Sequence, residues 1–394
     1  MTTDAAPRPD VAAPAVADTT SRRLAINRLL ARTRLDASAV DRFLARRTAP
    51  IVEGTRCTFL WRGEADEVVL HHSVFRFHGP VPLRRVDGTD LWYVIIDLPE
   101  GSRVEYQLEI TRGGQHERFN DPLNPHLAHN PFGSTSVCFG HGYETPEWTQ
   151  PASGQRNGTL EEIVVPSRAF QRDRAVTVYR PAGFRRAARY PLLIVHDGAD
   201  YLTYAAAQTV LDNLIGRGDM AAVVAAFVSP GGDRLAEYSD SPEHARFLAT
   251  ELVPRLEAAY PLAGPSARCL MGASLGGVAA LSAACRYPGR YGSLLLQSGS
   301  FVFTENGGRP EIEPVVRFVS AFRAAPRRVA NRAFVSCGAY EPLVIPNRAM
   351  VPVFQAAGMA VRYTEARDGH SWENWRDRLR EGFTWIFPGE HEQR

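Results

Sequence analysis

One pentapeptide constrains the fold of this chain more than any other segment: Gly272-Ala273-Ser274-Leu275-Gly276, the only G-x-S-x-G sequence in 394 residues. It follows the apolar residues 269–271 and precedes a run of small residues, 278–284. These flanks predict a strand, a sharp turn and a helix, because small neighbours let strand and helix approach closely around a strained serine. Ser274 is therefore a candidate nucleophile, although a glycine-rich turn without chemistry would contain the same residues.

A serine hydroxyl becomes a nucleophile only with a base, and the base needs a group that orients it. In a sheet of this kind the chain order is serine, acid, histidine. Glu341 follows the apolar residues 333–337, and His370 follows a second strand-like segment, 361–365. We expect Glu341 to be the acid and His370 the base. Asp368 as the acid, or a serine–histidine pair without one, stays open as an alternative.

Two backbone N–H groups are expected to stabilise the oxyanion of such a reaction. The first is that of Leu275, at the amino end of the helix predicted after the serine. The second should come from the turn after the apolar residues 191–195, where Gly198 or Ala199 is the candidate. The histidine and aspartate that precede these two residues are expected only to shape the turn.

The charge composition argues against binding to nucleic acid or to an anionic membrane. The formal net charge is only +2, and all 45 basic residues are arginines spread along the sequence. A nucleic-acid-binding domain usually carries a basic cluster. The absence of lysine excludes chemistry through a lysine Schiff base. We expect a small-molecule substrate and no cofactor.

The spacing of cysteine and histidine predicts neither disulfides nor a metal site. The five cysteines are dispersed, odd in number and mostly within apolar runs, which is typical of buried, reduced thiols. Zinc-type ligand spacing does not occur. The first twenty residues lack the apolar segment of a signal peptide, and no run is long enough to span a membrane. A cytoplasmic location is the resulting expectation.

Changes of pattern along the chain predict its domain boundaries. Residues 1–20, rich in Ala, Pro, Asp and Thr, are expected to form a disordered tail, and apolar residues at helical spacing predict short helices within 21–48. Apolar and polar residues alternate in segments of 49–144, which predicts a small β-sandwich. Residues 145–158, rich in Pro, Ser, Gly and Asn, are the expected linker.

The remaining residues, 159–394, alternate between strand-like and helix-like segments. This alternation predicts an α/β fold with a mostly parallel sheet covered by helices on both faces. One of the helices is expected from an apolar face formed by Phe247, Leu248, Leu252, Leu256 and Ala259.

Several motifs together resemble those of the enterochelin (enterobactin) esterases, which are esterase-D-like enzymes of α/β-hydrolase fold. The resemblance covers the chain from about residue 51 to its end. The motifs are DPLNP at 121–125, HDGADY at 196–201, GDRLAEY at 232–238, GASLGG at 272–277, QSGSF at 297–301, CGAYE at 337–341 and GHSWENW at 369–375. Most of these motifs resemble those of esterase-D-like enzymes in general, whereas the predicted sandwich with its DPLNP sequence resembles the siderophore esterases in particular.

The resemblance implies hydrolysis of a ferric catecholate siderophore, with Ser274 as nucleophile, His370 as base and Glu341 as acid. Arg234 would face the negatively charged ferric substrate. Trp372, which lies beside the histidine in the sequence, is a candidate for lining the pocket. Iron would belong to the substrate and not to the enzyme. A homo-oligomer is left open.

Two other functions fit the same residues. A carbohydrate-linked esterase, such as a feruloyl or acetyl esterase, would use the sandwich to bind glycans and would be exported. A catalytically inactive homologue would bind a siderophore without hydrolysing it, although the complete set of serine, acid and histidine candidates argues against that function.

Overall fold

The computed structural model describes residues 14–16, 23–33, 35–75, 77, 79–303 and 310–389. The chain divides into two compact units. Unit 1 comprises Met1–Glu144 together with two short loops from far along the sequence, Ala339–Glu341 and Ala366–His370. Unit 2 comprises Thr145–Gly338, Pro342–Glu365 and Ser371–Arg394. Most of the predicted tail, 1–20, lies outside the described residues.

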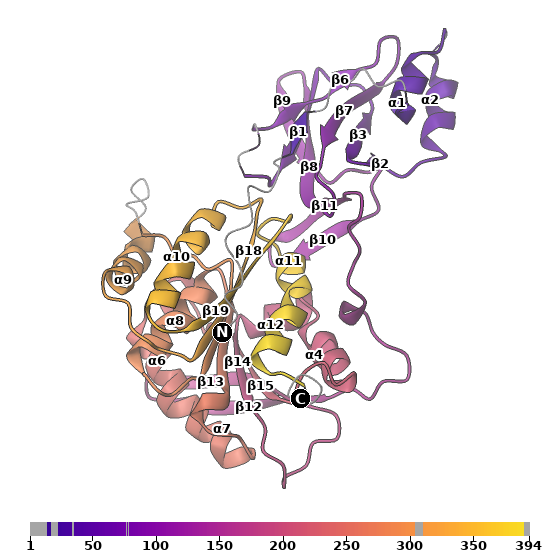
Figure 1. The fold of residues 1–394 in the computed structure, drawn as a ribbon. Coiled ribbons are helices and arrows are strands. Elements are labelled where there is room, and N and C mark those ends of the chain that lie inside the picture. The colour runs from indigo at the N-terminus through magenta and orange to yellow at the C-terminus, as the bar shows by residue number, and fades with distance from the viewer. Residues whose placement is uncertain are drawn as a thin grey trace. The chain divides into compact units, whose positions relative to one another are not determined.

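Unit 1 contains two β-sheets and two short helices (Figure 1). One sheet has the strand order β1-β7-β3-β2, with β6 also paired to β7, and the other has the order β10-β11-β8-β4-β5, with β9 paired to β8. The described strand pairs are antiparallel. The elements are β1 (Ala15–Val16), α1 (Ala25–Leu30), α2 (Ala37–Leu44), β2 (Ile51–Glu53), β3 (Arg56–Arg62), β4 (Glu67–His72), β5 (Val81–Pro82), β6 (Arg84–Arg85), β7 (Leu91–Asp97), β8 (Arg103–Arg112), β9 (Gln115–Phe119), β10 (Leu127–Asn130) and β11 (Gly133–Phe139).

Strand β7 contributes side chains to both apolar clusters of unit 1, one between the two sheets and one against α1 and α2. Its side chains alternate, so that Trp92 and Ile96 pack into the core between the two sheets. The alternate residues Leu91, Tyr93 and Ile95 pack in a second cluster with apolar residues of α1 and α2. Both faces of the strand are therefore buried, which accounts for its almost continuous apolar sequence.

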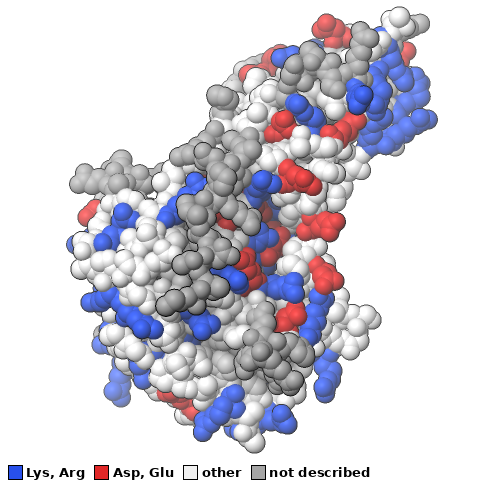
Figure 2. Space-filling model, viewed as in Figure 1, with Lys and Arg blue, Asp and Glu red and all other residues white. Residues whose placement is uncertain are grey.

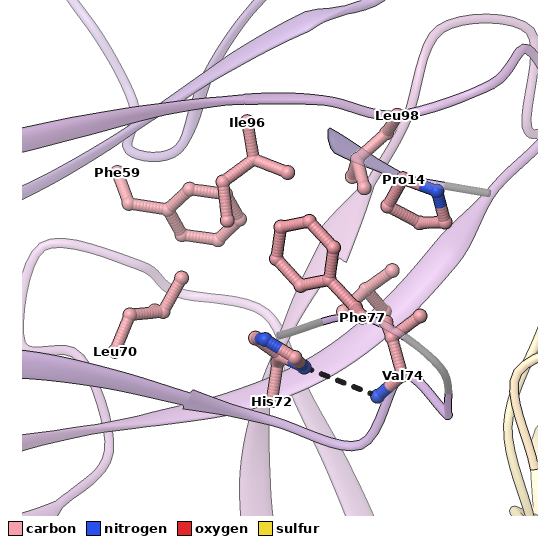
Figure 3. Close-up of a pocket in the computed structure, with 9 residues that line it drawn as sticks. Pro14, Phe59, Leu70, His72, Val74, Phe77, Ile96 and Leu98 are labelled. Atoms are coloured by element: carbon pink, nitrogen blue, oxygen red, sulfur yellow. Dashed lines mark hydrogen bonds between the residues drawn. The ribbon is translucent and has the colours of Figure 1, made fainter. Parts of the chain in front are cut away.

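A small apolar pocket lies in the core of unit 1. Figure 3 shows the ring of Phe77 beside Pro14 and His72, with the His72 ring accepting a hydrogen bond from the Val74 N–H at 3.3 Å. The open volume is about 10 Å³, roughly the room that one water molecule needs. This pocket is therefore too small for an ester substrate.

Arginines gather on the two helices of unit 1. Figure 2 shows a group of basic side chains over this region and charges of both signs elsewhere on the same face. The exposed arginines in these helices and in the residues next to them are Arg23, Arg28, Arg32, Arg42, Arg46 and Arg47. Arginine is therefore spread along the whole sequence, but exposed arginines are concentrated around α1 and α2.

Unit 2 is built on an eight-stranded sheet of order β12-β13-β15-β14-β16-β17-β18-β19 among the described residues. Strands β12 and β13 form an antiparallel hairpin, β13 is antiparallel to β15, and the strands from β15 to β18 are parallel. The strands are β12 (Thr159–Ser167), β13 (Arg172–Arg180), β14 (Leu192–His196), β15 (Val224–Val228), β16 (Arg268–Ala273), β17 (Ser293–Gln297), β18 (Arg332–Gly338) and β19 (Ala360–Ala366).

Helices cover both faces of this sheet (Figure 1). On β14, Leu192 and Ile194 pack into one apolar cluster, whereas Leu193 and Val195 pack into the other. Both faces of this strand are therefore buried. The helices are η1 (Glu147–Thr149), α3 (Gly198–Tyr204), α4 (Ala207–Gly216), α5 (Arg234–Tyr238), α6 (Pro242–Arg246), η2 (Phe247–Leu252), α7 (Val253–Ala259), η3 (Pro265–Ala267), α8 (Leu275–Arg286), η4 (Pro310–Ile312), α9 (Glu313–Ala324), α10 (Val344–Ala356), α11 (Trp372–Asp377) and α12 (Leu379–Ile386).

The predicted α/β fold with a mostly parallel sheet is confirmed. The helix expected from the apolar face at 247–259 differs in one respect, because η2 is π-helical and only α7 is α-helical. Four of the five residues of the predicted face, from Phe247 to Leu256, are fully buried in the core. The apolar periodicity located this helix but did not distinguish the two backbone geometries.

Candidate active site

The G-x-S-x-G segment forms the expected strand, turn and helix. Ser274 lies between β16 and α8 with φ 57° and ψ −122°, a backbone conformation that costs energy for a residue with a side chain. A Cβ atom at Gly272 would overlap the backbone of Gly276, so this crossing of strand and helix requires glycine. The strain is maintained by the buried strand and helix on either side.

The Ser274 hydroxyl lies next to a second hydroxyl that the sequence analysis did not single out. Its Oγ is 3.2 Å from the Oγ of Ser300, and the Ser300 N–H donates to the Ser274 carbonyl at 3.0 Å. The Ser274 N–H donates to the Gln297 carbonyl at the end of β17. Ser300 belongs to the QSGSF motif, but a serine in a loop gives no local signal that it will face a nucleophile.

Leu275 is the first residue of α8. The first N–H groups of an α-helix have no carbonyl acceptor within the helix, and they point away from its amino end. The helix dipole adds a partial positive charge at the same place. The Leu275 N–H therefore has the position expected of an oxyanion donor beside Ser274.

The turn after β14 holds the two candidates for the second donor. Asp197 has a left-handed backbone with φ 54°, and α3 begins at Gly198. A Cβ atom at Gly198 would overlap the backbone of Phe227 in the neighbouring strand, so glycine is required there. The Ala199 N–H donates to the Ser229 Oγ at 3.1 Å. A substrate oxygen at the Ala199 N–H would therefore replace or share this serine contact.

Arg234 is paired with the side chain of Asp197. Its Nε and Nη2 donate to the two carboxylate oxygens at 2.7 and 2.8 Å, a bidentate ion pair. Burial alone would lower the pKa of Arg234, but Asp197 outweighs it and raises this pKa above its usual value. The Arg234 side chain is 37% exposed and that of Asp197 only 2%. Arg234 thus fixes the turn that carries Gly198, and its contact with a substrate stays a prediction.

His196 and His244 lie in a buried polar cluster behind this turn. The His196 Nδ1 is 2.8 Å from the Met271 carbonyl, and burial followed by the charge of His244 lowers its pKa to about 3. The His244 Nδ1 is 2.9 Å from the carboxylate of Glu237, which also binds Arg174 at 2.8 Å. His196 is therefore a neutral, fully buried residue, and its role in shaping the turn stays a prediction.

Glu341 and His370 are hydrogen-bonded to each other. The Glu341 Oε2 lies 2.5 Å from the His370 Nδ1, and because a carboxylate only accepts, the imidazole nitrogen donates. The Glu341 side chain is 1% exposed, whereas that of His370 is 38% exposed. The pair thus has a buried orienting carboxylate and an accessible ring, which is the arrangement of a general base.

Asp368, the alternative acid, is committed to other partners. Its Oδ1 accepts from Arg103 Nη1 at 3.0 Å and from the Gly369 N–H at 2.7 Å. Arg103 is 1% exposed and was not considered in the sequence analysis. The structure therefore favours Glu341 over Asp368 as the group that orients His370.

The strands that precede the three candidate residues, β16, β18 and β19, all end at the same edge of the sheet. Parallel strands end at the same edge, and Ser274 directly follows β16. The Ala360 N–H bonds to Asn331 before β18, and the Ala339 N–H bonds to Ala366 at the other end, so β19 runs in the same direction as β18. Glu341 and His370 follow these two strands within a few residues.

Trp372 lies in an aromatic cluster. It is 8% exposed, and its ring makes edge contacts with Tyr201 at 5.2 Å and with Trp375 at 4.7 Å between centroids. The Trp375 Nε1 donates to the Ser298 Oγ at 3.0 Å. Both tryptophans thus pack the last helices against the sheet, and contact of Trp372 with a substrate stays a prediction.

Within the residues that the structure describes, no group of three or more His, Cys, Asp or Glu side chains is placed to hold a metal ion. The five cysteines are all buried free thiols, as predicted. Over the same described ranges, no helix combines the length and the apolar character needed to cross a membrane.

A protein-family model described as "Putative esterase" matches residues 167–386. The iron(III) enterobactin esterase of Dickeya dadantii is 26% identical over an alignment that covers 89% of this chain and 93% of that protein. The crystal structure of the enterobactin esterase from Shigella flexneri in the presence of enterobactin has a TM-score of 0.71 at 20% identity, covering 88% of this chain and 97% of that one. A ferulic acid esterase structure has a TM-score of 0.52 at 21% identity and covers 59% of this chain and 98% of its own.

Proposed function

The chain belongs to the esterase family and is a carboxylic ester hydrolase, and from this premise we propose that its substrate is a catecholate siderophore, a ferric trilactone of the enterobactin type. The observation that carries the proposal is the extent of the similarity. The relative from Dickeya dadantii is similar over 89% of the chain, well beyond residues 167–386 of the family match. The likeness to the ferulic acid esterase ends at 59% of the chain.

In the proposed reaction, Ser274 attacks a serine ester carbonyl of the trilactone. The Nε2 of His370 takes the proton from the Ser274 hydroxyl as the carbon–oxygen bond forms. Glu341 holds the imidazole through Nδ1 and stabilises the positive charge that develops on the ring. His370 then gives the proton to the departing serine hydroxyl of the substrate, which leaves an acyl-enzyme on Ser274.

The tetrahedral intermediate carries its negative charge on the former carbonyl oxygen. We propose that the N–H of Leu275 and the N–H of Gly198 or Ala199 donate to this oxygen. The loss of one such donor lowers turnover by about 10²–10³ in enzymes of this type. Arg234 contributes by fixing Asp197 and hence the second donor.

Water resolves the acyl-enzyme by the same route in reverse. His370 removes a proton from the water molecule, the new tetrahedral intermediate collapses, and the Ser274 oxygen regains the proton. The products are a free carboxylate and a free hydroxyl for each ester bond that is cleaved. Opening of the lactone ring removes the covalent link that preorganises the three catecholates around iron, which lowers the affinity for the metal.

The test compares four esters: ferric enterobactin, iron-free enterobactin, methyl ferulate and p-nitrophenyl acetate. We expect cleavage of the trilactone to have the highest kcat/KM and to disappear in Ser274→Ala. Ser282→Ala is the matched control, because Ser282 is a buried serine on α8, the helix that follows Ser274, and its hydroxyl binds Asp240 at 2.5 Å.

Other outcomes identify the other functions. Cleavage of methyl ferulate without cleavage of either form of enterobactin would favour a feruloyl esterase. Tight binding of ferric enterobactin without cleavage of any ester would favour an inactive binding protein. A homo-oligomer also stays a prediction, and light scattering after gel filtration measures it directly.

A further inference from the structure

The loops that carry Glu341 and His370 both belong to unit 1 and not to the unit that supplies their strands. Tyr340 joins them: its N–H donates to the Asp368 carbonyl at 3.0 Å, and its carbonyl accepts from the Phe75 N–H at 2.7 Å. The Tyr340 ring is 3% exposed and lies in the core between the two sheets of unit 1. The loop that carries Glu341 (the acid loop) is thus hydrogen-bonded to the loop that carries His370 (the base loop). It is also anchored in the core of unit 1.

Arg103 makes the corresponding attachment to the base loop. It is the first residue of β8 and is 1% exposed. Its Nη1 donates to the Asp368 Oδ1 at 3.0 Å, and its backbone N–H donates to the Arg367 carbonyl at 2.9 Å. Its Nη2 donates to the Glu105 Oε1 at 3.0 Å. Side chain and main chain of one buried arginine therefore hold two consecutive residues of the loop.

The two carboxylates that Arg103 binds, Glu105 and Asp368, also accept hydrogen bonds from other groups. The second oxygen of Glu105 accepts from the Thr135 Oγ1 at 2.7 Å, on the neighbouring strand β11. Asp368 accepts the Gly369 N–H at 2.7 Å, directly before His370. A Cβ atom at Gly369 would lie 3.2 Å from the Ser73 Oγ, so the loop runs close to the sandwich at this point.

We propose that Arg103 is a positioning residue for catalysis: it holds Asp368 and thereby fixes the loop that presents His370. The proposal rests on the proposed role of His370 as the base. It assigns to Arg103 a part in the chemistry that requires no contact between Arg103 and the substrate.

The chemistry of the pair explains why an arginine is needed. A guanidinium has two donor directions in a rigid plane, which lets Nη1 bind Asp368 while Nη2 binds Glu105. A lysine has the same charge but a flexible stem and a single nitrogen, so it cannot fix both carboxylates in this geometry. Removal of the arginine would leave the buried Asp368 and the partly buried Glu105 without the positive charge that neutralises them, and the loop would move to bring Asp368 closer to water.

The test uses the full chain with Arg103→Lys, Arg103→Ala and Asp368→Ala. Tyr106→Phe is the matched control, because it removes two buried hydrogen bonds within unit 1, to Asp121 at 2.6 Å and from Asn124 at 3.0 Å, whose partners lie outside both loops. Hydrolysis of p-nitrophenyl acetate gives kcat and KM at a temperature where every variant is folded by circular dichroism. We expect kcat to fall about 10²-fold in the Arg103 variants, the size of effect that a small misplacement of a catalytic group produces.

A readout that is independent of catalysis comes from proton NMR. A proton in a short bond between an imidazole nitrogen and a carboxylate resonates at low field, and His370→Ala identifies the resonance from the Glu341–His370 pair. We expect this resonance to shift or broaden in Arg103→Lys and to stay in place in the Tyr106→Phe control. A purely structural role for Arg103 would lower the melting temperature and leave the resonance where it is.

The combined variant tests whether Arg103 acts through Asp368. If it does, Arg103→Ala together with Asp368→Ala has the same kcat as Asp368→Ala alone. If the losses of kcat in the two single variants add up in the combined variant, the proposal is overturned. It is also overturned if Arg103→Lys has the kcat of the wild type and an unshifted resonance. If Arg103→Ala does not fold, Arg103→Lys and Asp368→Ala still decide. If the wild type hydrolyses p-nitrophenyl acetate but not enterobactin, the substrate proposal fails and this one is still tested.

Discussion

Replacement of Glu341 by glutamine tests the catalytic assignment most directly. The change keeps the size of the side chain and removes its negative charge beside His370, 2.5 Å from the Nδ1. The positive charge on the ring during the reaction would lie roughly 4 Å from the centre of the carboxylate. At an effective dielectric constant of about 20, two unit charges at that separation attract each other by about 4 kcal/mol.

This energy is lost from the transition state, where the ring is charged, and not from the ground state, where it is neutral. The expected fall in kcat is therefore about 10³-fold, since 1.4 kcal/mol corresponds to a factor of ten. KM should change little, because Glu341 is buried and does not reach the substrate. The assay is steady-state hydrolysis of p-nitrophenyl acetate, which reports the proton transfers by His370 without binding energy from a siderophore.

Asp368→Asn is the comparison variant, because Asp368 is the alternative acid and also lies in the base loop. We expect a smaller loss there, since its Oδ1 binds Arg103 and Gly369. A loss below tenfold in Glu341→Gln would refute the reasoning and support a serine–histidine pair. A larger loss in Asp368→Asn than in Glu341→Gln would transfer the role to Asp368.

Two further changes give distinct expectations. Arg234→Ala should lower hydrolysis of ferric enterobactin and of p-nitrophenyl acetate, because Asp197 loses its bidentate partner and the turn at Gly198 loosens; a loss confined to the ferric substrate would instead show a direct charge contact. The second change concerns His196, which is buried and neutral, with a pKa lowered to about 3. Its contribution to stability is complete above the pKa of an unfolded histidine, near 6.5. That contribution is lost as the pH falls from there toward 3. His196→Gln should therefore flatten the pH dependence of the unfolding free energy, measured by urea denaturation, by up to about 1.4 kcal/mol per pH unit within that window; an equally steep dependence in the variant would contradict the assignment of a neutral histidine.

Local patterns located the elements and the candidate residues of this chain. The strand, turn and helix around Ser274 follow from a few consecutive residues, because only glycine permits that crossing. Glu341 and His370 became candidates because each stands a few residues past a strand, β18 and β19 respectively. In such cases the signal lies within about ten residues of the site, which is the range of turn and strand chemistry.

Pairings between distant residues could not be predicted in this way. Arg103 and Asp368 are 265 positions apart, and neither stands in a motif that requires the other. Arg234 illustrates the same limit over a shorter range, since its sequence position indicates a charged contact but not that Asp197 is the partner. The aromatic cluster around Trp372 depends likewise on the order of helices over the sheet.

The attachment of the loops that carry Glu341 and His370 to unit 1 gives that unit a structural reason to be retained. An edge strand such as β19 has a neighbour on one side only, so the loop after it has few contacts from its own sheet. In this chain the missing support for that loop comes from Arg103 and from the core around Tyr340. Such support would be lost if unit 1 were exchanged for an unrelated module. The similarity to the Dickeya dadantii enterobactin esterase over 89% of the chain, and not only over residues 167–386, is what this dependence would produce.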